Sequence, residues 1–163
     1  MTARFYGWTT VSGMACPQRL RWLFREYPIY YITACTYNRR RMLDRPDVHD
    51  SFIQFGLRAH EYCVSVGRYV IMPDHVHLFA GLRPESISVS VWMKSFKNAI
   101  SNTLKLATFQ GPHWQKGFFD HVIRSEESYD QKWLYVRDNP VRAGLVRSAD
   151  DWPYAGEISK SLY

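Results

Sequence analysis

The alternation of hydrophobic and polar positions divides the chain into four strand-like runs and three helix-like runs. Strands are indicated where β-branched and aromatic residues cluster between turn residues, and helices where hydrophobic residues recur every three or four positions. Pro140 sets the end of the last helix, because proline disfavours helical geometry in the residue before it. The pattern predicts strands over 27–37, 69–72, 76–82 and 114–124, and helices over 47–65, 86–106 and 126–139.

This order of elements, β-α-β-β-α-β-α, predicts an α+β fold. The first six elements match the ferredoxin-like βαββαβ arrangement, an antiparallel sheet with two helices on one face. The additional C-terminal helix is then available to cover the opposite face. We expect one domain over residues 1–163, because a chain of this length forms one hydrophobic core. Within it we expect a basic N-terminal arm over 1–25, a core with the C-terminal helix over 26–154, and a tail over 155–163.

Composition adds a bias towards nucleic acid. The net charge is +6 and aromatic residues make up 16% of the chain. Lys and Arg contact phosphates, and aromatic rings stack on unpaired bases. Composition alone leaves a nucleic-acid-binding protein and a basic protein that binds none equally open.

The cysteine spacing and the lack of long apolar runs indicate a location in the cytoplasm. The three cysteines, Cys16, Cys35 and Cys63, form no Cys-x-x-Cys motif, so neither a disulfide framework nor a zinc knuckle is indicated. No run approaches 18 apolar residues, and the N-terminus lacks the shape of a signal peptide. We therefore expect a protein of the reducing cytoplasm with no membrane partner.

The triplet His75-Val76-His77 is the strongest chemical signal in the chain. Residues i and i+2 of a strand point to the same face, so the two imidazoles can close on one divalent metal ion. A pair of ordinary half-buried histidines is the more frequent explanation of such a triplet taken alone.

A second pair of polar residues lies in the predicted C-terminal helix. Tyr135 and Asn139 are four residues apart, a spacing that places both side chains on one helical face. If this helix covers the open face of the sheet, a phenol and an amide oxygen approach the histidines. An oxygen ligand suits Mg²⁺ or Mn²⁺, and imidazoles also suit transition metals. A metal that polarises a phosphate would allow the phenol to attack phosphorus, although most of the 11 tyrosines must serve the core or the surface.

Four linked segments resemble the HUH single-tyrosine transposases, and within them the REP-associated tyrosine transposases of the IS200-like branch. The resemblance runs from about Arg19 to Tyr154 and depends on the order of the segments more than on any one of them. The segments are YVIMPDHVHL (69–78), WQKGFFDHVIR (114–124), YVRDNPVRAGLV (135–146) and DWPY (151–154).

The resemblance implies a ferredoxin-like fold, a Mg²⁺ or Mn²⁺ cofactor, and a tyrosine that cleaves single-stranded DNA and retains the 5′-phosphate. By position, His75 and His77 match the metal-binding histidines and Tyr135 matches the nucleophile. Asn139 lies where related enzymes place a polar third ligand, often Gln. His121 also matches a family position; an accessory role at the metal and a structural role in the sheet are both open.

The partner implied by the resemblance is single-stranded or hairpin DNA in the bacterial nucleoid. Seven basic residues are predicted phosphate contacts: Arg39, Arg40, Arg41, Lys94, Lys97, Arg137 and Arg142. A homodimer that exchanges the tyrosine helix and a monomer that acts alone are both open. Two other functions are open as well: a domesticated protein that binds DNA hairpins without cleaving them, and a metal phosphohydrolase that uses water as its nucleophile.

Overall fold

The computed structural model describes residues 27–123 and 126–160. The predicted basic arm, residues 1–25, lies outside the described residues. The strands are β1 (Ile29–Cys35), β2 (Val64–Met72), β3 (His75–Leu82), β4 (Phe119–Ile123) and β5 (Ala155–Glu157). The α-helices are α1 (Pro46–Leu57), α2 (Val89–Leu106), α3 (Glu126–Arg137) and α4 (Asn139–Arg142), and 3₁₀ turns cover Tyr37–Arg39, Ala59–Tyr62 and Ala149–Asp151.

The five strands form one antiparallel sheet in the order β4-β1-β3-β2-β5. The first four strands in this order have the ferredoxin-like arrangement, which confirms the predicted fold class. The chain turns tightly at Pro73 and Asp74 between β2 and β3, so the two strands form a hairpin. The hairpin places β3, which begins at His75, at the centre of the sheet.

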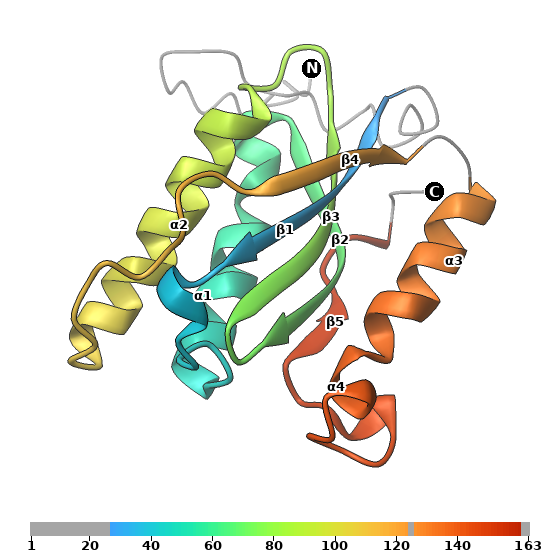
Figure 1. Cartoon of the computed structure of the whole chain (residues 1–163). Coiled ribbons are helices and arrows are strands. Elements are labelled where there is room, and N and C mark those ends of the chain that lie inside the picture. The colour runs from blue at the N-terminus through green and yellow to red at the C-terminus, as the bar shows by residue number, and fades with distance from the viewer. Residues whose placement is uncertain (1–26, 124–125, 161–163) are drawn as a thin grey trace, which may run out of the picture.

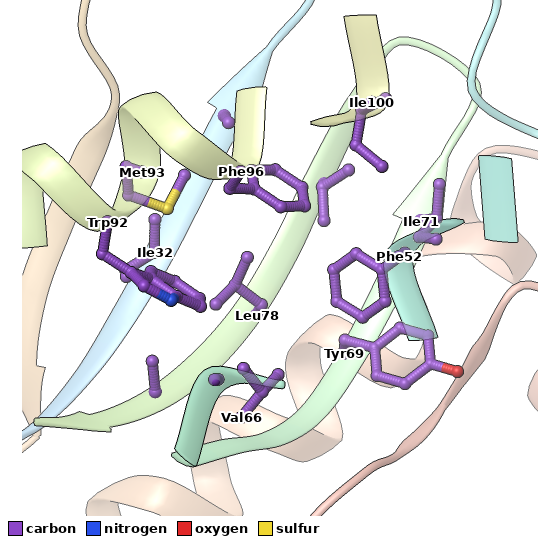
Figure 2. Close-up of a cluster of buried hydrophobic side chains, with 14 of the residues drawn as sticks. Ile32, Phe52, Val66, Tyr69, Ile71, Leu78, Trp92, Met93, Phe96 and Ile100 are labelled. Atoms are coloured by element: carbon purple, nitrogen blue, oxygen red, sulfur yellow. The ribbon is translucent and has the colours of Figure 1, made fainter. Parts of the chain in front are cut away.

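Helices α1 and α2 cover one face of the sheet, and α3 lies against the other (Figure 1). The larger core fills the space between the sheet and α1 and α2. Aromatic side chains of the two helices pack there on residues of the strands. Trp92 lies beside Ile32, and Phe52 lies beside Tyr69 and Ile71 (Figure 2). Burial of these rings contributes to the hydrophobic stabilisation that holds α1 and α2 on the sheet.

A smaller core joins α3 to the opposite face. Tyr129 and Val136 of α3 are fully buried against Phe79 of β3 and Val70 of β2. The Tyr129 and Phe79 rings are 4.5 Å apart between centroids. The buried Tyr129 and Val136 and the partly buried Trp133 follow a helical period, so one side of α3 faces the sheet.

Several predicted boundaries were wrong. The helix predicted over 47–65 ends at Leu57, because a 3₁₀ turn and a left-handed Cys63 (φ 56°) follow it, and β2 already begins at Val64. The strand predicted over 114–124 is confined to β4, because Gly117 (φ 73°) turns the chain. Trp114 retains a single bridge to Thr36.

The C-terminal part of the chain also differs from the prediction. Helix α3 ends at Arg137, two residues before the predicted end, and α4 begins at Asn139 with Pro140 in its first turn, where proline is well tolerated. Residues 155–157, predicted as part of a tail, form β5 on the edge of β2. Gly156 is required there, because a Cβ atom would lie 2.9 Å from the Tyr69 hydroxyl.

No helix within the described residues is long and apolar enough to span a membrane.

Candidate active site

The two histidines lie side by side on β3, on the face of the sheet that α3 partly covers. Their ring centroids are 4.6 Å apart and the rings are nearly perpendicular, at 82°. The alternation of β3 that directs His75 and His77 to this face directs Val76 and Leu78 into the larger core. Two imidazoles therefore converge at the centre of the sheet.

The neighbouring strand β1 orients His77. Thr33 lies opposite His77 in the β1–β3 register, and its hydroxyl is 2.8 Å from the His77 Nδ1 atom. The Tyr31 hydroxyl is 2.7 Å from the same nitrogen. The two hydroxyls occupy Nδ1 and leave Nε2 as the free ring nitrogen of His77.

An acidic side chain orients His75 in the same way. The Asp74 Oδ1 atom is 2.6 Å from the His75 Nδ1 atom, and Asp74 Oδ2 forms an ion pair with Arg39 Nε at 2.9 Å. Asn38 and Arg39 are both left-handed, with φ of 51° and 55°, which turns the chain back after β1. An Arg–Asp–His chain thus holds the second imidazole with its Nε2 atom free.

Burial keeps both imidazoles neutral. The pKa of His77 is lowered to about 3, first by burial and then by the charges of His75, Arg39, Arg142 and Lys132. The pKa of His75 is also lowered by burial, and Asp74 opposes this effect. A neutral imidazole offers its free nitrogen to a metal ion.

This arrangement suits a divalent ion. Histidine ligands characteristically donate their other ring N–H to a carboxylate or another oxygen, and both Nδ1 atoms have such partners here. Residues 27–123 and 126–160 contain no group of three or more His, Cys, Asp and Glu that could hold a metal. A third ligand from these described residues would then be an amide, hydroxyl or main-chain oxygen, and open coordination positions would remain for a substrate.

Tyr135 lies near the end of α3 with 62% of its side chain exposed. The Arg142 guanidinium lies 4.0 Å from the centroid of its ring and donates a hydrogen bond of 2.7 Å to its main-chain oxygen. The pKa of Tyr31 is raised by burial and also by the Tyr135 phenol. Arg142, which stacks on the Tyr135 ring, also contributes to lowering the pKa of His77.

The sequence predicted one helix that carries both Tyr135 and Asn139. This was wrong, because Asn139 is the first residue of a separate helix, α4. Its side-chain oxygen accepts a hydrogen bond from Arg142. Arg142 therefore joins the two residues, since it contacts the ring of one and the amide of the other.

The predicted DNA contacts are distributed over both faces of the molecule. The positive charges of Arg39 and Arg142 contribute to lowering the pKa of His77. Lys94 and Lys97 lie on α2, which covers the opposite face, and the Lys97 ammonium donates to the main-chain oxygens of Gln115, at 3.0 Å, and Gly117. Of the remaining three, Arg40 donates a hydrogen bond of 2.8 Å to the main-chain oxygen of Gln110. Arg41 is exposed, and Arg137 forms an ion pair with Asp150.

His121 is exposed on the edge strand β4, opposite Tyr31 in the register. It therefore shares the face of the two histidines, with β1 between β4 and β3. Trp114 and Gln115 connect the loop before β4 to the rest of the fold, since Trp114 Nε1 donates to the Lys97 oxygen and the Gln115 N–H donates to the Cys35 oxygen.

Four residues of this site escaped the sequence-based prediction: Tyr31, Thr33, Asp74 and Lys132. Asp74 could have been found, because it adjoins His75. Tyr31 and Thr33 have the i, i+2 spacing of one strand face, but only the β1–β3 register shows that they meet His77. The Lys132 ammonium lies 5.1 Å from the centroid of the Tyr31 ring, a contact that depends on the placement of α3.

Relatives of this chain carry names that agree with the resemblance of its motifs. An Escherichia coli (strain K12) protein named REP-associated tyrosine transposase is 26% identical over 101 residues, which are 60% of this chain and 59% of that protein. The chain thus spans less than two thirds of that relative. A Haemophilus influenzae protein named for the same group is 22% identical over 153 residues, which are 86% of this chain and 87% of that protein.

One solved structure has the same fold over most of the chain. It is a REP-associated tyrosine transposase bound to a REP hairpin, with a TM-score of 0.64, 23% sequence identity, and coverage of 85% of this chain and 86% of that one. A family model described as IS200-like transposase matches residues 26–139, from the start of the described core to the first residue of α4. Because this match covers well over half of the sequence, the chain belongs to the IS200-like transposase family.

Proposed function

We propose that this protein is a metal-dependent nuclease and strand transferase that cleaves single-stranded DNA next to a hairpin through a covalent 5′-phosphotyrosine. The observation that carries the proposal is the arrangement of one chain: two neutral imidazoles with free Nε2 atoms lie side by side, and a helix carrying an exposed tyrosine is packed on the same face of the sheet. Pure binding of DNA would require neither feature.

The ligands we propose are His75, His77 and Asn139, with Mg²⁺ or Mn²⁺ as the ion. When bound, the ion supplies Lewis-acid polarisation of the scissile phosphate and stabilises the charge that develops on its oxygens. Asn139 can serve as a ligand once its oxygen is released from Arg142, and a rotation of either side chain achieves this.

The Tyr135 phenol is the proposed nucleophile. The phenol gives up its proton as its oxygen bonds to phosphorus. The bond from phosphorus to the 3′ oxygen breaks, and this oxygen takes up a proton and leaves as a 3′-hydroxyl. Arg142 holds the phenol ring by stacking on it, and the positive charge of Arg142 lies near the site that the phosphate would occupy. In the second step another 3′-hydroxyl attacks the phosphotyrosine and restores the phenol.

Hairpin DNA is the proposed substrate because a solved relative is bound to a REP hairpin and because this chain has a net charge of +6. Arg39, Arg142 and Lys132 provide positive charge beside the histidines. The exposed Arg41 and Lys94, together with Arg40, Lys97 and Arg137, are proposed to contact phosphates farther from the cleavage site, so affinity should fall steeply as salt increases.

The substitution Tyr135→Phe tests the nucleophile. We expect the variant to bind a hairpin with an unpaired flank like the wild type and to form no covalent adduct in Mg²⁺ or Mn²⁺, as measured by a shift in denaturing electrophoresis. Tyr62→Phe is the matched control, because Tyr62 is also exposed but lies outside the site, in the turn before β2. An adduct formed by Tyr135→Phe at the wild-type rate would refute the assignment.

The same experiment separates the two other functions. A wild-type chain that binds the hairpin but never cleaves it, with or without metal, would be a domesticated binding protein. A chain that hydrolyses phosphate esters equally well after Tyr135→Phe would use water as its nucleophile.

A further inference from the structure

Phe119 is an exposed aromatic residue at the edge of the face that carries the two histidines. Phe119 begins β4, the edge strand of the sheet, and 60% of its side chain is exposed. In Figure 1, β4 lies beside β1, at the opposite edge of the sheet from β5. Phe119 therefore presents an accessible ring at a sheet edge that lies two strands from the histidines.

Phe119 continues a row of rings that starts at the histidines. The His77 and Tyr31 rings are stacked, with centroids 5.6 Å apart and planes 19° apart. The Tyr31 and Phe119 rings meet edge to face, with centroids 6.4 Å apart and planes 69° apart. Thr33 pairs with both His77 and Phe119 in the register of β1, so all of these side chains share one face.

Positive charge lies along the same row. The Lys132 ammonium lies over the Tyr31 ring at 5.1 Å, and Lys132, Arg39 and Arg142 all act on His77. Asp120, the acidic residue of β4, pairs with Ile32, a residue of the larger core, so it points to the other face. The row thus combines the accessible Phe119 ring with positive charges, and the Asp120 carboxylate lies on the other face. Aromatic rings next to positive charges are typical of sites that bind single-stranded nucleic acid.

We propose that Phe119 and His121 form a nucleobase subsite, in which an unpaired base of the substrate strand stacks on the Phe119 ring. His121 follows on the same face of β4 and offers a ring nitrogen to the base or its phosphate. Two strand spacings, about 10 Å, separate β3 from β4. The base in this subsite therefore lies close along the strand to the phosphate at His75 and His77. This inference rests on the proposed function for the identity of the strand.

The location distinguishes Phe119 from other exposed apolar residues. Leu106, with 88% of its side chain exposed, ends α2 on the opposite face and has no place in the row of rings. Single exposed apolar residues of this kind are ordinary on protein surfaces. Leu106→Ala is therefore the matched control for Phe119→Ala.

The test measures binding of two hairpins by chains that carry Tyr135→Phe, so that cleavage does not interfere. One hairpin has an unpaired flank with 2-aminopurine near the cleavage site, and the other has blunt ends. We expect Phe119→Ala to weaken binding of the flanked hairpin about 5- to 100-fold and to abolish the quenching of 2-aminopurine. Binding of the blunt hairpin should not change, Phe119→Tyr should restore both signals, and Leu106→Ala should behave like the parent.

Unchanged affinity and quenching in Phe119→Ala would overturn the subsite. An equal loss of affinity for the blunt hairpin would overturn it as well, because the residue would then act on DNA binding in general. The result does not depend on catalysis. Phe119-dependent quenching would support the subsite even if the wild-type chain formed no adduct at Tyr135, so the subsite and the proposed function can fail separately.

Discussion

Arg142 connects the two polar residues of the C-terminal segment, and its removal should affect the reaction more than the binding of DNA. We expect Arg142→Ala to slow formation of the phosphotyrosine adduct about 10-fold or more, because a phenol without its stacked guanidinium samples unproductive orientations. Arg142→Lys should recover only part of the rate, since an ammonium lacks the planar fork of the guanidinium. Single-turnover rates and hairpin dissociation constants, measured separately, check this.

The control for this prediction is Arg147→Ala, which removes the same charge at another exposed position. If Arg142→Ala raised the dissociation constant of the hairpin while the single-turnover rate stayed at the wild-type value, Arg142 would be a DNA contact and not a positioning residue.

Asp74 should determine metal affinity through His75. Its carboxylate accepts the Nδ1 proton and so fixes the tautomer with Nε2 free. Partners of this kind typically contribute 10- to 100-fold to metal affinity, so we expect Asp74→Asn to weaken Mn²⁺ binding by about that factor. Calorimetric titration with Mn²⁺ in the absence of DNA measures it, with Asp50→Asn on the exposed side of α1 as the control. Equal Mn²⁺ affinity in wild type and Asp74→Asn would contradict the role.

The buried His77 should make folding stability depend on pH. Its pKa falls from an ordinary 6.5 to about 3 in the folded protein, so the unfolded chain binds more protons between these values. The contribution to stability is complete above pH 6.5 and is lost as the pH falls towards 3. Without metal, urea denaturation should show lower stability at pH 4.5 than at pH 7.5, and His77→Gln should reduce this difference. A pH dependence as steep in His77→Gln as in the wild type would exclude His77 as its source.

Periodicity predicted the order of the helices and strands and the faces on which they pack, but it did not predict where each of them ends. Val64 continues the apolar spacing of the preceding helix, and only the left-handed Cys63 shows that the helix has already stopped. The β5 segment, Ala155–Glu157, lacks β-branched and aromatic residues, so no local signal marks it as a strand. It forms because Trp152 Nε1 and Tyr154 O hydrogen-bond to the main chain of Ile71, a contact between distant parts of the chain.

In the site as well, features set by neighbouring residues were predictable, whereas contacts between distant parts of the chain were not. The alternation of a strand was enough to predict that His75 and His77 share one face. Tyr31 and Thr33, which lie 46 and 44 positions before His77, meet it through the register of β1 and β3, and Lys132 depends on how α3 packs. Sequence therefore predicted that the two histidines share a face, and the fold was needed to identify the residues that orient them.

At the scale of the whole molecule, the position of α3 favours an enzyme that acts with its own tyrosine. Tyr129 and Val136 anchor α3 to the sheet that carries the histidines of the same chain, and Tyr135 lies between them in sequence. A mixture of Tyr135→Phe and His77→Ala chains should then form no adduct, because no chain holds both groups. In a dimer that exchanges this helix, the mixture would instead form an adduct on the His77→Ala chain. Tagging the two variants with different masses identifies the labelled chain, and an adduct on His77→Ala at a substantial fraction of the wild-type rate would show that the tyrosine acts across subunits.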